Sequence, residues 1–542
     1  MRFSLPGNID CSHGKFPSSQ DAKYDVVVAG AGHNSLITAA YLAKAGLRVL
    51  VLESRPVIGG NTTSEELTLP GYLHDSCSSA HVLIQSSPTI KNNELHLDRY
   101  GLSYIKPEIV ATMPFSDGHS FTMYWDKEKT VKEISRYSQK DALEYQKFLD
   151  DWSKVSNVYL SERYGPPRKE SEILKLYEEL ENGDEWVRIR LSSSKEVIEE
   201  RFEEEHVRAF LCWMASQTVQ PITRKNTGFL AFSILAGRQN NSWTLPRGGS
   251  ISLPLALQRF IEERGGKIVT SAHVSKVLIE KGRAVGFETI DGRRFYARKV
   301  CVSSMHVKDL VKAIDQTLIP EDFAESVKNW KVGITLFVTH YALSEAPRYR
   351  SEDGSVMAGI GGAAESVDNL VMNFQLAEQG KLNWKTPCLL LVCPSVADSS
   401  RAPLGKHTYK IIAFVTGNLR EGKWDDIKEE YSKAIFEYVS SLTTNIKSNT
   451  VLGKLVESPL DLWKRNPANW GGSCHGGDMT SEQNGLFRPS PKWSNYRMFV
   501  EGLYQTGDCT HPGGSVSGAP GRNAAKVILE DLAIDFDKVA SA

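Results

Sequence analysis

A glycine-rich turn close to residue 30 constrains the fold of this chain more than any other sequence feature. Residues 24–29 form a β-branched, apolar run typical of a buried strand, and Gly30 and Gly32 follow it directly. Apolar residues then recur at helical spacing as far as Gly46, and a second strand is predicted at residues 48–52. This order of strand, tight turn, helix and strand predicts the βαβ unit of a Rossmann-type domain.

The same turn has the composition that binding of a dinucleotide requires. Gly30 permits the tight turn, Gly32 leaves space for a pyrophosphate, and Ser35 is small enough for the helix to pack closely on the strand. The free N–H groups and the dipole at the start of the helix favour a phosphate. Glu53 ends the second strand, where a carboxylate accepts hydrogen bonds from ribose hydroxyls. The pattern predicts a bound adenine dinucleotide, and a glycine turn without a ligand is the alternative.

The residues after Glu53 and a second glycine-rich loop indicate that the dinucleotide is FAD. Arg55, Gly59 and Gly60 suit a loop that folds over a pyrophosphate and reaches a flavin ring. Far along the sequence, a strand predicted at residues 503–506 leads into a second glycine-rich loop and then a helix. Two such loops, so far apart in the sequence, predict that both segments close on one extended cofactor.

The second loop supplies groups suited to the flavin end of that cofactor. Gly507 opens this loop, and Asp508 is placed to accept a hydrogen bond from a ribityl hydroxyl. The backbone amides near Gly514, Ser515 and Val516 are expected to donate to the flavin ring or the phosphates. They belong to a helix start, which stabilises an anionic reduced flavin.

These motifs resemble those of the FAD-dependent amine oxidase and phytoene desaturase superfamily. The nearest resemblance is to the branch of bacterial phytoene desaturases, cyanobacterial-type beta-carotene ketolases and pyridine-nucleotide-disulphide-oxidoreductase-like proteins. It rests on residues 28–60, 246–250 and 507–523 and on Val274 in its strand, which together span nearly the whole chain. The resemblance implies FAD without a separate NAD domain. It assigns the cofactor to Gly30, Gly32, Ser35, Glu53, Arg55, Gly59, Gly60, Val274, Gly507, Asp508, Gly514, Ser515 and Val516.

The expected fold class is α/β with mixed α+β character, a Rossmann-type FAD-binding domain with an inserted substrate domain of mixed sheet and helices. The active site is expected between the two domains. The predicted boundaries are a flexible leader at 1–20, a discontinuous FAD-binding domain at 20–110, 240–320 and 455–542, and a substrate domain at 111–239 and 321–454.

Three further local structures are predicted within these domains. Residues 125–217 are expected to be helical, with the acidic run from Glu199 to Glu205 as a solvated helix face. Residues 274–302 are expected to form antiparallel strands with tight turns. The glycine-rich stretch 359–362 lacks the context of a nucleotide motif and is predicted to be a loop.

The candidate catalytic side chains are His475, His511 and Arg247. Both histidines lie in segments that should face the flavin, where an imidazole can act as acid or base or can orient the cofactor. Arg247 is suited to pair with a phosphate or an acidic substrate group, and a packing role is the alternative. The candidate aromatic residues of a substrate pocket, with core packing as the alternative, are Trp213, Trp243 and Trp470.

Composition and charge narrow the possible partners. The formal net charge of −1 argues against a nucleic-acid partner, because phosphate binding relies on an excess of Lys and Arg. The eight cysteines are scattered without metal-ligand spacing, so no metal site is predicted and reduced thiols in a cytoplasmic protein are expected. The sequence shows no apolar run long enough for a membrane span. A peripheral membrane contact through 125–217 stays open.

The sequence therefore predicts an FAD-dependent oxidoreductase that desaturates or oxidises a hydrophobic small molecule by hydride transfer to flavin N5. Oxygen or a quinone is the expected electron acceptor. The alternatives are an amine or amino-acid oxidase, a flavin-dependent non-redox isomerase, and a non-enzymatic lipid- or protein-binding module on the fold of the GDP-dissociation inhibitors. The sequence does not define the substrate or the oligomeric state.

Overall fold

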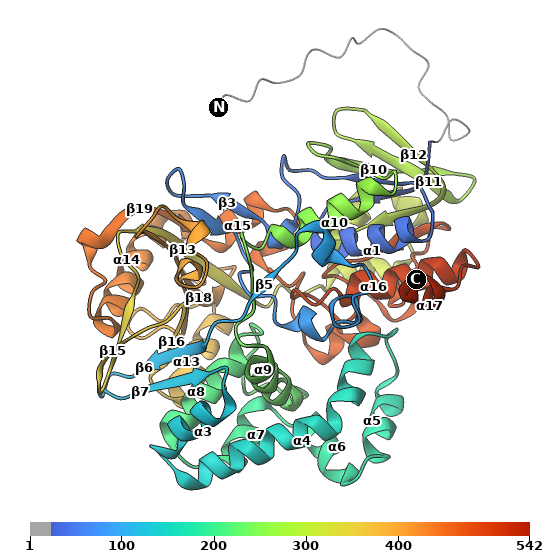
Figure 1. Cartoon of the computed structure of the whole chain (residues 1–542). Coiled ribbons are helices and arrows are strands. Elements are labelled where there is room, and N and C mark those ends of the chain that lie inside the picture. The colour runs from blue at the N-terminus through green and yellow to red at the C-terminus, as the bar shows by residue number, and fades with distance from the viewer. Residues whose placement is uncertain (1–22) are drawn as a thin grey trace.

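A computed structural model describes residues 23–542, so the predicted leader lies outside the described residues. Two seven-stranded sheets stand at opposite sides of the molecule, and a layer of helices lies below them in Figure 1. The fold is mixed α/β, as predicted. Among the helices of residues 23–542, none combines the length and the apolar character that crossing a bilayer requires. The helices of the lower layer are α3 (Lys127–Ser135), α4 (Gln139–Arg163), α5 (Glu170–Glu178), α6 (Gly183–Leu191), α7 (Ser194–Arg201), α8 (Glu205–Ser216) and α9 (Gly228–Asn241).

The first sheet contains the predicted βαβ unit. The strand β1 (Tyr24–Ala29) lies parallel between β2 (Val49–Leu52) and β12 (Arg294–Ser303), and α1 (His33–Lys44) connects β1 to β2. The predicted strand, turn, helix and strand are therefore confirmed. The helices α10 (Ser252–Glu263) and α16 (Ala519–Asp531) pack on α1. The remaining strands of this sheet are β9 (Lys267–Val269), β10 (Val274–Glu280), β11 (Arg283–Thr289) and β20 (Leu503–Gln505).

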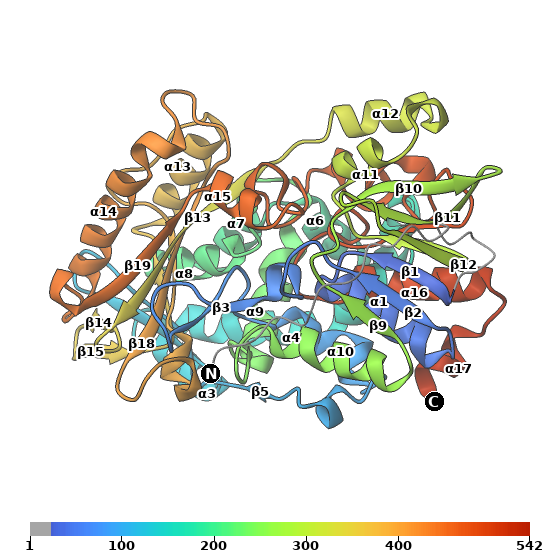
Figure 2. The ribbon, with the colours of Figure 1, turned by 90° about the horizontal axis from the view of Figure 1, so that it is seen from above.

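The second sheet is mainly antiparallel and lies at the left of Figure 2. On one face, Trp424 and Tyr431 of α14 (Trp424–Leu442) pack against Phe337. The opposite face packs against α8 and α13 (Val367–Glu378). In spatial order its strands are β19 (Val451–Glu457), β13 (Ile334–Leu343), β18 (His407–Thr416), β17 (Leu389–Val392), β16 (Ile360–Ala363), β6 (Ile109–Pro114) and β7 (Ser120–Tyr124).

The prediction of a loop at 359–362 is wrong, because this stretch forms the strand β16. Its glycines serve packing. A Cβ atom on Gly361 would lie 2.4 Å from the ring of Tyr349, and one on Gly362 would lie 2.7 Å from the ring of Trp213. The strand therefore needs glycine so that two buried aromatic rings can rest on its backbone.

The prediction of a single helix face from Glu199 to Glu205 is also wrong. The helix α7 ends at Arg201, and α8 begins at Glu205. Between them, the buried carboxylate of Asp141 accepts hydrogen bonds from the backbone N–H groups of Glu203 and Glu204, at 3.0 and 2.9 Å. These bonds satisfy the backbone outside a helix, which explains the break.

Candidate functional site

A cavity of about 530 Å³ is lined by residues from both sheets. One set of lining residues, here called the glycine-rich wall, comes from the turn at Gly30, from Glu53 and from the loops at 474–475 and 507–516. The other set, here called the apolar wall, consists of Val219, Ile234, Leu336, Leu390, Val392, Ile412 and Phe414.

The turn after β1 requires glycine at position 30 and leads into a helix start that lines the cavity. Gly30 has a φ of +98°, and a Cβ atom there would lie 2.2 Å from the Oγ atom of Ser304. Gly32 caps the N-terminus of α1, whose first turn contains no acidic residue. This helix start therefore presents free N–H groups to the cavity, which is the arrangement that binds a phosphate.

Glu53 is held in a fixed orientation beside this turn. Its Oε2 atom accepts a hydrogen bond from the backbone N–H of Ala31 at 2.8 Å. Its Oε1 atom accepts from the backbone N–H of Arg55 at 2.8 Å and from the hydroxyl of Ser54 at 3.1 Å. The carboxylate is buried and lines the cavity. Such a preorganised carboxylate is suited to accept hydrogen bonds from a ribose.

The C-terminal loop meets the start of α1. Nε2 of His33 lies within hydrogen-bonding distance of the backbone oxygen of Ser515, at 3.3 Å. Gly514 lies so close to His475 that an added Cβ atom would come within 2.6 Å of the His475 Cα atom. Burial raises the pKa of Asp508 to about 6. Segments more than 400 residues apart thus form one wall.

Arg488 holds this wall together and was not identified from the sequence. It is fully buried and donates hydrogen bonds to four backbone carbonyl groups. Two of these belong to His475 and Asp508, at 2.7 and 2.8 Å. Arg488 lies between two glycine-rich segments in the sequence, and this position could have identified it, because such loops need donors for their carbonyl groups.

Most of the predicted cofactor residues line the cavity. Two do not: Gly59 donates its N–H to the backbone oxygen of Ala31 at 2.8 Å, and Arg55 pairs with Glu65 at 2.9 Å. Both therefore lie behind the lining residues. The predicted cofactor residues that line the cavity are Gly30, Gly32, Ser35, Glu53, Gly60, Val274, Gly507, Asp508, Gly514, Ser515 and Val516.

The three candidate catalytic residues occupy different environments. His475 lines the cavity, and burial lowers its pKa to about 4, so its imidazole is neutral at physiological pH. His511 is buried outside the lining residues, with Nε2 at 2.8 Å from the backbone oxygen of Glu162. Arg247 is exposed and is not part of the lining.

Strand alternation builds much of the apolar wall. On β18, Ile412 and Phe414 face the cavity together with Lys410, while the intervening residues pack on α14. Of the candidate aromatics, Trp243 lines the cavity, whereas Trp213 donates to the backbone oxygen of Leu389 in the core.

Two polar lining residues of the cavity also escaped the sequence analysis. The ammonium group of Lys410 donates to the backbone oxygen of Cys77. A hydrogen bond with Cys474 lowers the pKa of the Cys77 thiol to about 7. Lys410 lies far from both glycine motifs in the sequence, and Cys77 follows the first of them without a motif of its own, so no local pattern marked either residue.

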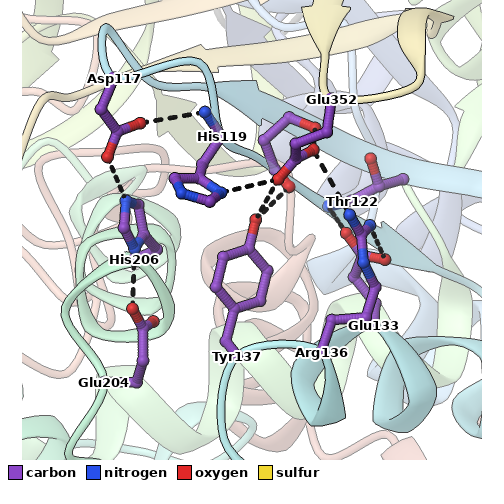
Figure 3. A network of polar contacts seen from close by, with 10 residues as sticks. Asp117, His119, Thr122, Glu133, Arg136, Tyr137, Glu204, His206 and Glu352 are labelled. Atoms are coloured by element: carbon purple, nitrogen blue, oxygen red, sulfur yellow. Dashed lines mark hydrogen bonds and ion pairs between the residues drawn. The ribbon is translucent and has the colours of Figure 1, made fainter.

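A separate polar network lies outside the cavity (Figure 3). His206 contacts Glu204 through Nδ1 at 2.7 Å and Asp117 through Nε2 at 2.8 Å. His119 contacts Glu352 at 2.9 Å, and the rings of His119 and His206 lie 5.0 Å apart. None of these residues lines the cavity. The network instead joins α8 to the loop between β6 and β7.

The residues of the glycine-rich wall fit FAD. The start of α1 offers N–H donors, and Glu53 and Asp508 offer acceptors for hydroxyl groups. These are the groups that the pyrophosphate, the ribose and the ribityl chain require.

Comparison with known proteins agrees with this assignment. A family model described as flavin containing amine oxidoreductase matches residues 36–529. The chain is 27% identical over 542 residues to a limonene dehydrogenase component of Castellaniella defragrans, covering 96% of both chains. It is 25% identical to the lycopene-forming phytoene desaturase of Pantoea ananas, covering 93% of this chain and 99% of that protein.

A solved structure shares the fold. An oxidoreductase from Methanosarcina mazei superimposes with a TM-score of 0.60 and 18% identity, covering 93% of this chain and 99% of that chain. The chain belongs to the family of flavin-containing amine oxidoreductases. It is an FAD-dependent oxidoreductase, which confirms the predicted family, cofactor and enzyme class and sets aside the non-enzymatic binding module.

Proposed function

We propose that this enzyme desaturates or oxidises a hydrophobic small molecule held in the cavity. The observation that carries the proposal is the meeting of the two walls: groups suited to FAD and a set of apolar side chains line one cavity. Two relatives named for limonene and phytoene act on hydrophobic compounds, which supports the same substrate class.

Bound FAD supplies a hydride acceptor, with oxygen or a quinone as the electron acceptor in our proposal. The chain's own contribution is to position the substrate and to exclude water through the apolar wall. His475 lines the cavity and is neutral at physiological pH, so it is the better placed of the two candidate histidines to contact a ligand. The division into an FAD-binding domain and an inserted substrate domain, with the predicted boundaries, belongs to this proposal.

The test is a visible spectrum of the purified protein, followed by anaerobic addition of apolar alkenes, primary amines and amino acids. Bleaching of the flavin bands by an apolar compound would support the proposal. Bleaching by amines or amino acids alone would replace it with an amine or amino-acid oxidase. A shifted double bond in the product without net oxidation would indicate an isomerase. A protein that binds no flavin after reconstitution with FAD would contradict the proposal.

A further inference from the structure

Arg238 and Trp243 lie together at the cavity. Arg238 is on α9, one helical turn after Ile234 of the apolar wall, and Trp243 follows the same helix. Both side chains line the cavity and are buried, with 8% and 2% of their surface exposed. The guanidinium carbon of Arg238 lies 3.7 Å from the centre of the Trp243 ring.

The hydrogen-bond donors of this pair lack acceptors. Within residues 23–542, no atom accepts a hydrogen bond from Nε or Nη1 of Arg238 or from Nε1 of Trp243. Stacking on the ring offsets part of the cost of burying the charge, but it leaves these N–H groups unpaired. Burial lowers the pKa of Arg238 to about 9, so the guanidinium still carries its charge at neutral pH. The cavity therefore contains a buried cation whose N–H groups have no acceptor among the described residues.

Two other buried arginines have a structural role, and the guanidinium group of each is paired within the protein. Arg488 donates to four backbone carbonyl groups, and Arg401 pairs with the buried carboxylate of Asp75 at 2.7 Å. Buried charges are stable when they are paired in this way. Arg238 departs from this pattern, which indicates that a ligand supplies its partner.

The position of Arg238 assigns that partner to the substrate. The cofactor already has N–H donors at the start of α1 and in the loop at 514–516. The helix α9 instead packs on α4, α7 and α8, on the side of the apolar wall. The N–H groups of Arg238 therefore face the part of the cavity that the glycine-rich wall does not line.

We propose that the substrate is an apolar molecule with one carboxylate, and that Arg238 and Trp243 bind this carboxylate inside the cavity. The inference rests on the proposed function only in placing the substrate in this cavity. One carboxylate balances the single charge of Arg238, and its oxygens accept hydrogen bonds from the planar guanidinium and from the indole N–H. A pure hydrocarbon would leave all these donors unpaired.

The test uses decanoate as an apolar carboxylate, with decanol and decylamine as neutral and cationic analogues of the same chain length. Binding to the purified holoenzyme is measured by titration calorimetry, which requires no turnover. Decanoate is expected to bind, and decylamine is expected to bind about 10-fold to 100-fold more weakly or not at all. Decanoate should also raise the Tm of the wild type.

The variant Arg238→Met removes the charge and keeps an apolar side chain of similar length. It should weaken decanoate binding by about 10-fold to 100-fold and abolish the rise in Tm. Without ligand, the variant should have a higher Tm than the wild type, because the unpaired buried charge is gone. Arg238→Lys should restore part of the affinity, and Trp243→Phe should weaken it by removing one donor. The matched control is Arg188→Met, at an exposed arginine of α6, and it should change none of these results.

Three outcomes would overturn the inference. Decylamine could bind as tightly as decanoate, or Arg238→Met could bind decanoate like the wild type. Arg238→Met could also lose its flavin while Arg188→Met retains it, which would make Arg238 a cofactor residue. The visible spectrum of each preparation reports separately on the proposed function, since bound flavin that no compound bleaches would contradict that function without changing the calorimetric result.

Discussion

The glycine-rich wall and the apolar wall differ in how far the protein satisfies its own polar groups. In the first, Arg488 donates to four backbone carbonyl groups, and Glu53 accepts from two backbone N–H groups. Beside the second, Arg238 and Trp243 have donors without acceptors among the described residues. In our proposal, the wall that binds the cofactor is thus prearranged by backbone contacts. The apolar wall instead leaves polar groups for the ligand to satisfy.

The largest expected effect comes from Gly30→Ala in the glycine-rich wall. At φ +98° an alanine costs about 1–3 kcal/mol in backbone strain. The new Cβ atom would also lie 2.2 Å from Oγ of Ser304, whose N–H donates to Ala29 at 2.8 Å. We expect flavin content to fall by about 10-fold or more, measured as flavin absorbance per protein.

The matched control lies outside the glycine-rich wall, in the loop between β6 and β7. Gly118 has a φ of +96°, and an added Cβ atom would meet nothing within 4 Å. Gly118→Ala therefore carries the same strain without the collision, and it should keep its flavin. Equal loss of flavin in both variants would show that strain alone is responsible and would remove the evidence for a tightly shaped cofactor wall.

The next effect concerns the pH dependence of stability at His475. Burial, with smaller contributions from Arg488 and Arg163, lowers its pKa from 6.5 to about 4. A lowered pKa gives stability that is present above pH 6.5 and is lost as the pH falls towards about 4, on the order of 3 kcal/mol in total. The Tm difference between wild type and His475→Gln should shrink over this range in thermal melts. A constant difference would show that His475 is not buried as described.

Glu53→Gln tests the acceptor of the glycine-rich wall. Glutamine keeps the shape but replaces one carboxylate oxygen with an NH2 donor, so a ribose hydroxyl of FAD that donates to this oxygen loses its acceptor. Loss of a hydrogen bond to a charged group costs about 2 kcal/mol, which corresponds to about 30-fold weaker FAD binding. Fluorescence titration of the apoprotein with FAD measures this change. Unchanged affinity would exclude Glu53 from cofactor binding.

The smallest effect is expected at His206 in the polar network of Figure 3. Its contribution to stability changes with pH in the opposite direction from that of His475. Burial opposes protonation of His206, but the hydrogen bonds to Glu204 and Asp117 outweigh it and raise the pKa. A raised pKa gives stability that is present below pH 6.5 and is lost as the pH rises through the higher value. His206→Gln should therefore lower the free energy of unfolding more at pH 6 than at pH 9, by less than about 1 kcal/mol. Thermal melts at the two pH values should show this as a larger fall in Tm at pH 6. A larger loss at pH 9 would contradict the network.

Sequence patterns predicted the first sheet well, because its signals are local. The turn at Gly30, the helix after it and the acid at Glu53 lie within one βαβ unit, and the structure has each of them. The prediction of a loop at 361 and 362 was wrong, because the role of these glycines depends on the rings of Tyr349 and Trp213. Trp213 comes from a distant part of the chain, and Tyr349 reaches Gly361 only through the fold of the intervening strands, so the local pattern does not mark either contact.

The apolar wall and its surroundings were less predictable for the same reason. Alternation along β18 marks two faces, but it does not show which face borders a cavity. Arg238 stands in an ordinary helical sequence, and its lack of acceptors depends on every neighbour that packs around it. A missing partner is a property of the folded molecule. Sequence patterns therefore do not show it.

The contact between His33 and Ser515 has a consequence for synthesis of the protein. A ribosome makes the start of α1 early, but the loop at 507–516 emerges only after nearly all of the intervening chain. During most of translation, the nascent βαβ unit therefore lacks the other side of its site. Tight capture of FAD should accordingly be one of the last steps of folding, and it can report that the C-terminal segment has docked.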